Sequence, residues 1–215
     1  MEKNILIADT AYAPTFSLAE RIRRIKDVVI SPLTSDLSRT FSGEKAPALI
    51  NWNRCSTFSA LAAVRQASSK QISIDTAVVA FNPFLGDKSE LDQLSTIDKV
   101  VNTHVKAYLL LFRELDQYFN TKEEGLLIPI LYRKSSELSF YEKIAASTFY
   151  ATIEQMLQDK NRNYTIKAID CGNLTISAIE NLVCQIIQDS NNSKRTSKWF
   201  EPDIKNPLKS IFSKF

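Results

Sequence analysis

Two continuous apolar segments decide the fold, IDTAVVAFNP (74–83) and GLLIPILY (125–132). Each precedes a long segment with apolar residues at helical spacing, at residues 95–119 and 138–159. Continuous apolar runs of strand length are typical of parallel strands that are buried on both faces. The order strand, helix, strand, helix with short connections predicts right-handed βαβ units.

The same alternation continues on both sides of this stretch. Further strands are expected at residues 3–9, 26–32, 46–52 and 164–171. Pro32 is expected to end the second strand, and Ser56 to cap the helix after the third. Six or seven parallel strands with helices on both faces predict an α/β fold, a Rossmann-like doubly wound sheet in three α/β/α layers.

The composition excludes several classes of protein. The 215 residues carry 27 basic and 24 acidic side chains, and a formal charge of +3 gives no case for nucleic-acid binding. Three distant cysteines without a C-x-x-C pair predict no metal site and indicate a reducing compartment, so a cytoplasmic location is expected. The absence of an apolar run near 18 residues predicts no membrane span.

A change in composition near Asp189 predicts a boundary. Residues 1–190 form the expected Rossmann-like domain. Residues 191–215 are polar, rich in lysine and interspersed with aromatic side chains, which indicates an irregular extension. Two interpretations stay open: this tail packs back on the domain, or it docks on a partner protein or an anionic surface.

Several segments resemble the short-chain dehydrogenase/reductase family over roughly residues 3–190. DKVVNTHVKAYLLLFREL (98–115) resembles its fourth helix, and KIAASTFYATIEQML (143–157) resembles the helix that carries its Tyr-x-x-x-Lys pair. ILIADTAYAPTFSLAERI (5–22) resembles its first strand, glycine loop and first helix, and IKAIDCGN (166–173) its sixth strand. The resemblance implies a homodimer or homotetramer through the helices near 95–119 and 138–159.

The family's glycine loop would fall on residues 8–15, where its glycines become Asp9, Ala13 and Thr15. Glycines there let the backbone approach a pyrophosphate at the helix N-terminus. Side chains obstruct that approach, Asp9 adds a negative charge, and Pro14 lacks an N–H donor.

Two further nucleotide-binding positions also differ from the family. Its ribose-binding acid would fall near residues 31–32, where no carboxylate stands, and its adenine-binding aspartate appears as Asn51 or Asn53. We therefore expect no cofactor.

The family's catalytic Asn, Ser, Tyr and Lys would fall on His104, Tyr132, Lys143 and Ser147. A family tyrosine acts as a general acid because a neighbouring lysine and the cofactor lower its pKa. Lys143 and Ser147 do not supply that pair, and Tyr141 lies about 200° around the helix from the expected position. His104 is predicted to be structural, although a nucleophile–base couple with Cys171 stays open.

Two functions follow from these residues. The first is a non-catalytic protein that binds or assembles with others. The alternative is a divergent oxidoreductase, or another enzyme, in which His104, Tyr132 and Lys143 reuse the cleft at the carboxyl ends of the strands. NAD(P) is expected only under that alternative.

Overall fold

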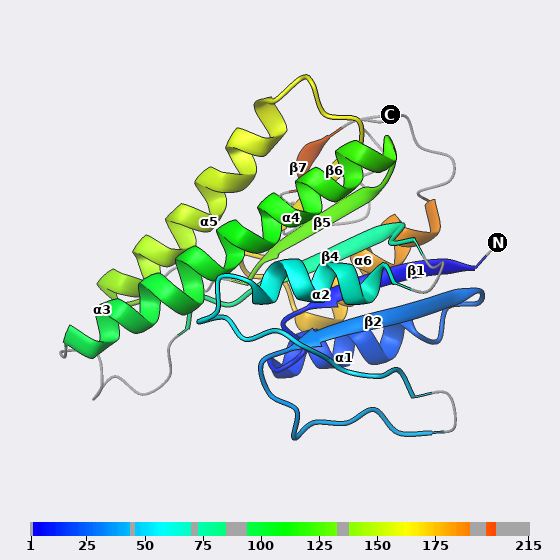
Figure 1. Cartoon of the computed structure of the whole chain (residues 1–215), viewed down its shortest axis with the longest axis horizontal. Coiled ribbons are helices and arrows are strands. Elements are labelled where there is room, and N and C mark those ends of the chain that lie inside the picture. Colours follow the sequence, from blue (N-terminus) through cyan, green and yellow to red (C-terminus); the bar gives the residue numbers. More distant parts are fainter. Residues whose placement is uncertain are drawn as a thin grey trace.

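A computed structural model describes residues 2–43, 46–69, 73–84, 94–132, 138–189 and 197–200. In this part of the chain, seven parallel strands form one sheet in the order β3-β2-β1-β4-β5-β6-β7 (Figure 1). The strands are β1 (Lys3–Ala8), β2 (Val28–Thr34), β3 (Ile50–Asn51), β4 (Thr76–Phe81), β5 (Leu126–Leu131), β6 (Thr165–Asp170) and β7 (Lys198–Phe200). The predicted parallel α/β sheet is confirmed.

Helices cover both faces of this sheet. Helices α1 (Ala13–Ile22) and α6 (Ile176–Asp189) lie on one face, and α2 (Ser59–Ala67), α4 (Ala107–Lys122) and α5 (Phe140–Gln158) lie on the other (Figure 1). Every residue of β4 and β5 is buried, because both faces of these central strands are covered. The three predicted layers are therefore present.

The helix predicted at residues 95–119 is divided into three parts. Helix α3 (Leu94–Val100) leads into a π-helical segment, η2 (Val101–Lys106), and then into α4. The Ala107 N–H donates to the carbonyl of Asn102, five residues back, which is the hydrogen bond of a π-helix. Such a segment holds one extra residue, and simple helical spacing does not predict it.

Strands β2 and β3 differ from the prediction. Pro32 lies inside β2 and does not end it. Leu33 O accepts from Thr10 N on the β1 side, and Thr34 O accepts from Trp52 N on the β3 side. Since successive residues of a strand point their backbone groups to opposite sides, the missing N–H of Pro32 faces away from β1. The third strand, predicted at residues 46–52, covers Ile50–Asn51 alone.

Two further predictions are wrong in detail. Ser56 does not cap α2, which begins at Ser59 after Phe58. Residues 198–200, predicted to be irregular, form β7, where Phe200 is buried and Trp199 stacks on Tyr150 of α5 with ring centroids 4.6 Å apart. Residues 201–215, including the predicted partner-docking segment, lie outside the described residues. No helix in the described ranges is long and apolar enough to cross a membrane.

Candidate functional site

Asp9 follows directly after β1, where the resemblance places the first glycine of the loop. Its φ of 69° lies in the left-handed region that glycine favours, so the backbone keeps a glycine-like path around an aspartate. The residue as a whole is 3% exposed. A buried carboxylate requires a counter-ion or hydrogen-bond donors, and both are present.

Arg54, in the turn after β3, supplies the counter-ion. Its Nη2 atom pairs with Oδ1 of Asp9, and the two side chains are 14% and 4% exposed. The guanidinium carbon lies 5.2 Å from the ring centroid of Trp52 and 5.6 Å from that of Tyr108. These aromatic faces favour a cation and hold Arg54 over the end of β1.

Tyr108 of α4 completes this group, which we call the Asp9 cluster (Asp9, Arg54 and Tyr108). The Tyr108 hydroxyl lies 3.1 Å from Oδ2 of Asp9 and 3.1 Å from the carbonyl of Ala80, so its single proton is shared between two acceptors. Burial raises the pKa of Tyr108, so the hydroxyl stays protonated and donates. The pKa of Asp9 is also raised, chiefly by burial, although Arg54 and Tyr108 act in the opposite direction.

The N-terminus of α1 lies next to the Asp9 cluster. Tyr12 is the N-cap residue and its side chain makes no capping hydrogen bond, and Pro14 in the first turn has no N–H. Thr15 is fully buried, and among the described residues its hydroxyl has no hydrogen-bond partner. An anion approaching this helix end would meet the Asp9 carboxylate and one donor fewer than a glycine loop offers.

The end of β2 changes one prediction about the nucleotide site. Because β2 continues to Thr34, the residues after it are not 31–32, and a carboxylate does follow the strand at Asp36. Asp36 is exposed and accepts from the backbone N–H of Ser38 at 2.9 Å. Hydrogen bonding from the side chain of Ser38, followed by that from its backbone, lowers the pKa of Asp36, which is therefore ionised at neutral pH.

His104 lies in η2 with 9% of its surface exposed. Its ring meets that of Phe81 edge-on at 5.9 Å, at the carboxyl end of β4. The Thr103 hydroxyl donates to the carbonyl of Lys99 at 2.6 Å, so it accepts from His104 Nδ1 at 2.8 Å. The proton of a neutral His104 therefore sits on Nδ1. Burial, followed by Arg54 and Lys99, lowers its pKa to about 4.

Tyr132 lies directly after β5 but on the other side of the sheet, in the core that α1 and α6 cover. Its ring meets the Tyr12 ring edge-on at 5.3 Å, and its buried hydroxyl has no hydrogen-bond partner in the described ranges. Cys171 belongs to the same core, and burial raises the pKa of its thiol. The thiol is thus not an activated thiolate, and it is separated from His104 by the sheet.

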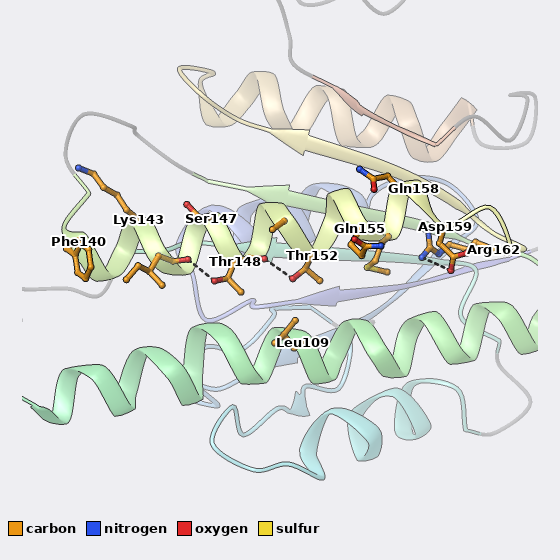
Figure 2. Close-up of a pocket in the computed structure, with 13 residues that line it drawn as sticks. Leu109, Phe140, Lys143, Ser147, Thr148, Thr152, Gln155, Gln158, Asp159 and Arg162 are labelled. Carbon is orange, nitrogen blue, oxygen red and sulfur yellow. Dashed lines mark hydrogen bonds and ion pairs between the residues drawn. The ribbon is translucent and has the colours of Figure 1, made fainter.

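Lys143 and Ser147 are exposed on α5. They line an open groove of about 1130 Å³ on the outer surface of α4 and α5. Figure 2 shows them along α5, with Leu109 projecting from α4. The structure thus does not gather His104, Tyr132, Lys143 and Ser147 into one site.

Glu142 is a buried acid that the sequence analysis did not single out. It lies in the first turn of α5, is 2% exposed, and accepts from the backbone N–H of Ser139 at 2.7 Å. The Ser139 side chain accepts in turn from Glu142 N, which makes a capping box. Its charge acts to raise the pKa of His104. The spacing Ser-x-x-Glu was the signal that could have found it.

No protein-family model matches the sequence, and no curated protein sequence matches it significantly. Solved structures do match. A short-chain dehydrogenase from Mycobacterium smegmatis has a TM-score of 0.71 at 13% identity, with 93% of this chain and 92% of that chain covered.

Two more structures give the same result. A mutant short-chain dehydrogenase/reductase from Serratia marcescens has a TM-score of 0.66 at 16% identity, over 92% of this chain and 95% of that chain. An alcohol dehydrogenase from the archaeon Thermococcus sibiricus, complexed with 5-hydroxy-NADP, has a TM-score of 0.69 at 10% identity, over 93% and 96%. At such identities the likeness is one of fold.

Proposed function

We propose that this chain, which has the fold of the short-chain dehydrogenases, is a non-catalytic cytoplasmic protein that binds other proteins or assembles with them. The observation that carries the proposal is the Asp9 cluster. An ion pair closed by a tyrosine stands at the end of β1, beside the helix N-terminus at which this fold binds pyrophosphate. A pyrophosphate there would lie beside the Asp9 carboxylate and would compete with it for Arg54.

The catalytic positions support the same proposal. Tyr132 and His104 lie on opposite faces of the sheet, and Lys143 faces the outer groove. A proton relay requires its donors and acceptors within hydrogen-bond reach of one substrate. This chain would therefore use its fold as a scaffold, without a cofactor.

The assembly we propose is a homodimer through the outer groove of α4 and α5. Leu109 and Ile144 in this groove are 43% and 42% exposed, and Phe140 beside them is 70% exposed. A second copy suits this surface because Ser147 and Ala151, about one helical turn apart on α5, are small and exposed, so a second helix could approach closely. A two-fold axis near Ala151 would place α5 of one copy against α5 of the other, with these small side chains between them.

Equilibrium binding of NADH and NADPH tests the non-catalytic proposal. The full chain is titrated from micromolar to millimolar nucleotide and followed by nucleotide fluorescence, with an active short-chain dehydrogenase as the positive control. We expect no saturable binding. Saturable binding at micromolar concentration would overturn the proposal.

One observation favours the alternative, a divergent oxidoreductase that uses NAD(P). Asp36 follows β2, where this fold places the acid that binds the ribose of NAD. Replacing Asp36 with Asn separates the two functions. If NADH binds to the full chain and Asp36→Asn abolishes that binding, the alternative holds.

A further inference from the structure

Strand β2 is fully paired on one side alone. On the β1 side, the register runs without a break from Lys3 opposite Val28 to Ala8 opposite Leu33. On the other side, β3 pairs with Leu33 and Thr34. In the described part of the chain, no strand of the sheet lies against residues 28–32 on that side.

The backbone groups at this open edge can be assigned. Thr34 O points to the β3 side and Leu33 O points to the β1 side. Because backbone groups alternate along a strand, the N–H and C=O of Val28 and Ile30 point outward with those of Thr34. Those of Val29 and Ser31 point toward β1. This edge therefore carries two donors and two acceptors, two residues apart; those of Val28 belong to a half-buried residue and those of Ile30 to a residue that is 5% exposed.

A groove runs beside these groups. It measures about 1130 Å³, and residues 28–31 of β2 form one wall. Residues 46–48 form the opposite wall, and Gln66 and Ser69 at the end of α2 close one side. This wall belongs to the segment predicted as the third strand. Because β3 covers Ile50–Asn51 alone, residues 46–48 do not pair with β2, and the groove occupies the place of a longer β3.

We propose that this groove binds an extended segment of a partner protein as an added strand beside β2. An extended peptide offers N–H and C=O groups at the same two-residue period as Val28 and Ile30, which gives the occupant its class. An open edge with unpaired backbone groups is the usual template for such addition.

The walls of the groove define the side chains of the partner. Val29 is 37% exposed, and Ala46, Pro47 and Ala48 face it from the other wall. These surfaces suit small or β-branched uncharged side chains at alternate positions of the peptide. Charged residues of both signs, Arg24 and Asp27 among them, line the groove at the amino end of β2.

This surface is independent of the nucleotide site. It lies at the amino end of β2, whereas the Asp9 cluster lies at the carboxyl end of β1. Nucleotide binding could therefore fail or succeed without changing the outcome at the groove.

The experiment has two parts. Amide hydrogen exchange of the full chain, followed by NMR, is expected to show fast exchange at Val28 and Ile30 and slow exchange at Val29 and Ser31. A phage-displayed library of random peptides is then selected on the full chain. Selected peptides are expected to slow exchange at Val28 and Ile30.

A matched pair of variants completes the test. Val28→Pro removes an outward N–H and no donor of the β1 ladder, whereas Val28→Thr keeps both the N–H and the β-branched shape. We expect the proline variant to lose about tenfold in peptide affinity and the threonine variant to lose little.

Four outcomes overturn the inference. Slow exchange at Val28 and Ile30 in the free monomer would mean that the chain covers its own edge. Protection that grows with protein concentration would mean that two copies pair there. Failure to select any peptide, or equal peptide binding by Val28→Pro, would exclude strand addition.

Discussion

The hydroxyl of Tyr108 lies 3.1 Å from the carboxylate of Asp9, across 99 positions of the chain. The contact joins α4 to the end of β1, and Arg54 closes it from the turn after β3. Three elements are thus tied together at the place where the fold otherwise opens to a nucleotide. The stability of this end of the sheet depends on the charge balance within the Asp9 cluster.

Removing the cation should leave Asp9 as an uncompensated buried charge. We expect Arg54→Met to lower the free energy of unfolding by about 3 kcal/mol at neutral pH. Asp9 binds its proton more tightly in the folded state, so the loss should shrink as the pH falls toward the raised folded-state pKa. Urea unfolding at several pH values measures this.

The control for this prediction is Asp9→Asn combined with Arg54→Met. Asparagine tolerates the left-handed backbone at position 9. The double variant should cost clearly less than the sum of the two single variants. Additive losses would show that the ion pair does not couple the two sites.

A charge at the centre of the proposed dimer interface should separate the copies. Ala151→Glu would place two carboxylates opposite each other across the two-fold axis, so we expect a monomer in sedimentation equilibrium at concentrations where the wild type is a dimer. Ala62→Glu, at another exposed alanine on α2, is the control and should leave the dimer intact. A dimer that survives Ala151→Glu would rule out this interface.

His104 should give the protein a stability that is lost in acid. Its pKa is about 4 when folded and near 6.5 when unfolded, so the unfolded chain binds the proton more tightly. Stability is therefore complete above the unfolded pKa and falls as the pH drops toward 4, by about 3 kcal/mol in all.

His104→Asn is the comparison, since asparagine can still donate to Thr103 but does not titrate in this range. The stability that the wild type loses in acid, minus the stability that the variant loses, gives the contribution of His104 apart from that of the other titrating groups. Because His104 is the single histidine of the chain, its ring signals can also be followed directly by NMR. Titration near the unfolded value in the folded protein would contradict the burial of His104.

Gly125 should not accept a side chain. Its φ is +144°, and a Cβ added there would collide with the Phe119 ring. We expect Gly125→Ala to lower the free energy of unfolding by about 3 kcal/mol, from backbone strain and overpacking together. Gly43→Ala is the control, because φ is +103° there but nothing lies within 4 Å. Gly43→Ala should lower the free energy of unfolding by about 1 kcal/mol. An equal loss in both variants would show that the contact with Phe119 does not contribute.

The strands that could be predicted are those whose neighbours bury them on both faces. The burial of β4 and β5 is visible in the sequence, because both strands are continuous apolar runs. Pro129 does not prevent β5 from forming. Its ladder to β6 has pairs at Leu126–Leu127 and again at Ile130–Leu131, on either side of Pro129. Residues 46–49 have the same apolar character, but in the described part of the chain they pair with no strand, which sequence alone does not reveal.

The site was harder to predict because its partners are distant in sequence. Asp9 was marked by its position after β1, but nothing near it in the sequence indicates Arg54, which lies 45 residues away. The end of β2 was predicted too early because a proline is expected to end a strand. The missing N–H of Pro32 in fact faces the open edge of the sheet. Because of that error, Asp36 was not recognised as the carboxylate that follows β2.

The π-helical segment η2 has a consequence for how this chain tolerates changes in length. One residue of an α-helix corresponds to about 100° of rotation, and η2 stores one residue more than an α-helical turn holds. Deleting a single residue between Val101 and Lys106 would restore a continuous α-helix and leave the direction of α3 relative to α4 unchanged, because the extra residue is wound into the same turn. The chain should therefore tolerate the loss of one residue in η2, whereas a one-residue deletion inside α4, which has no extra residue to give up, would rotate α3 by about 100° relative to the rest of α4.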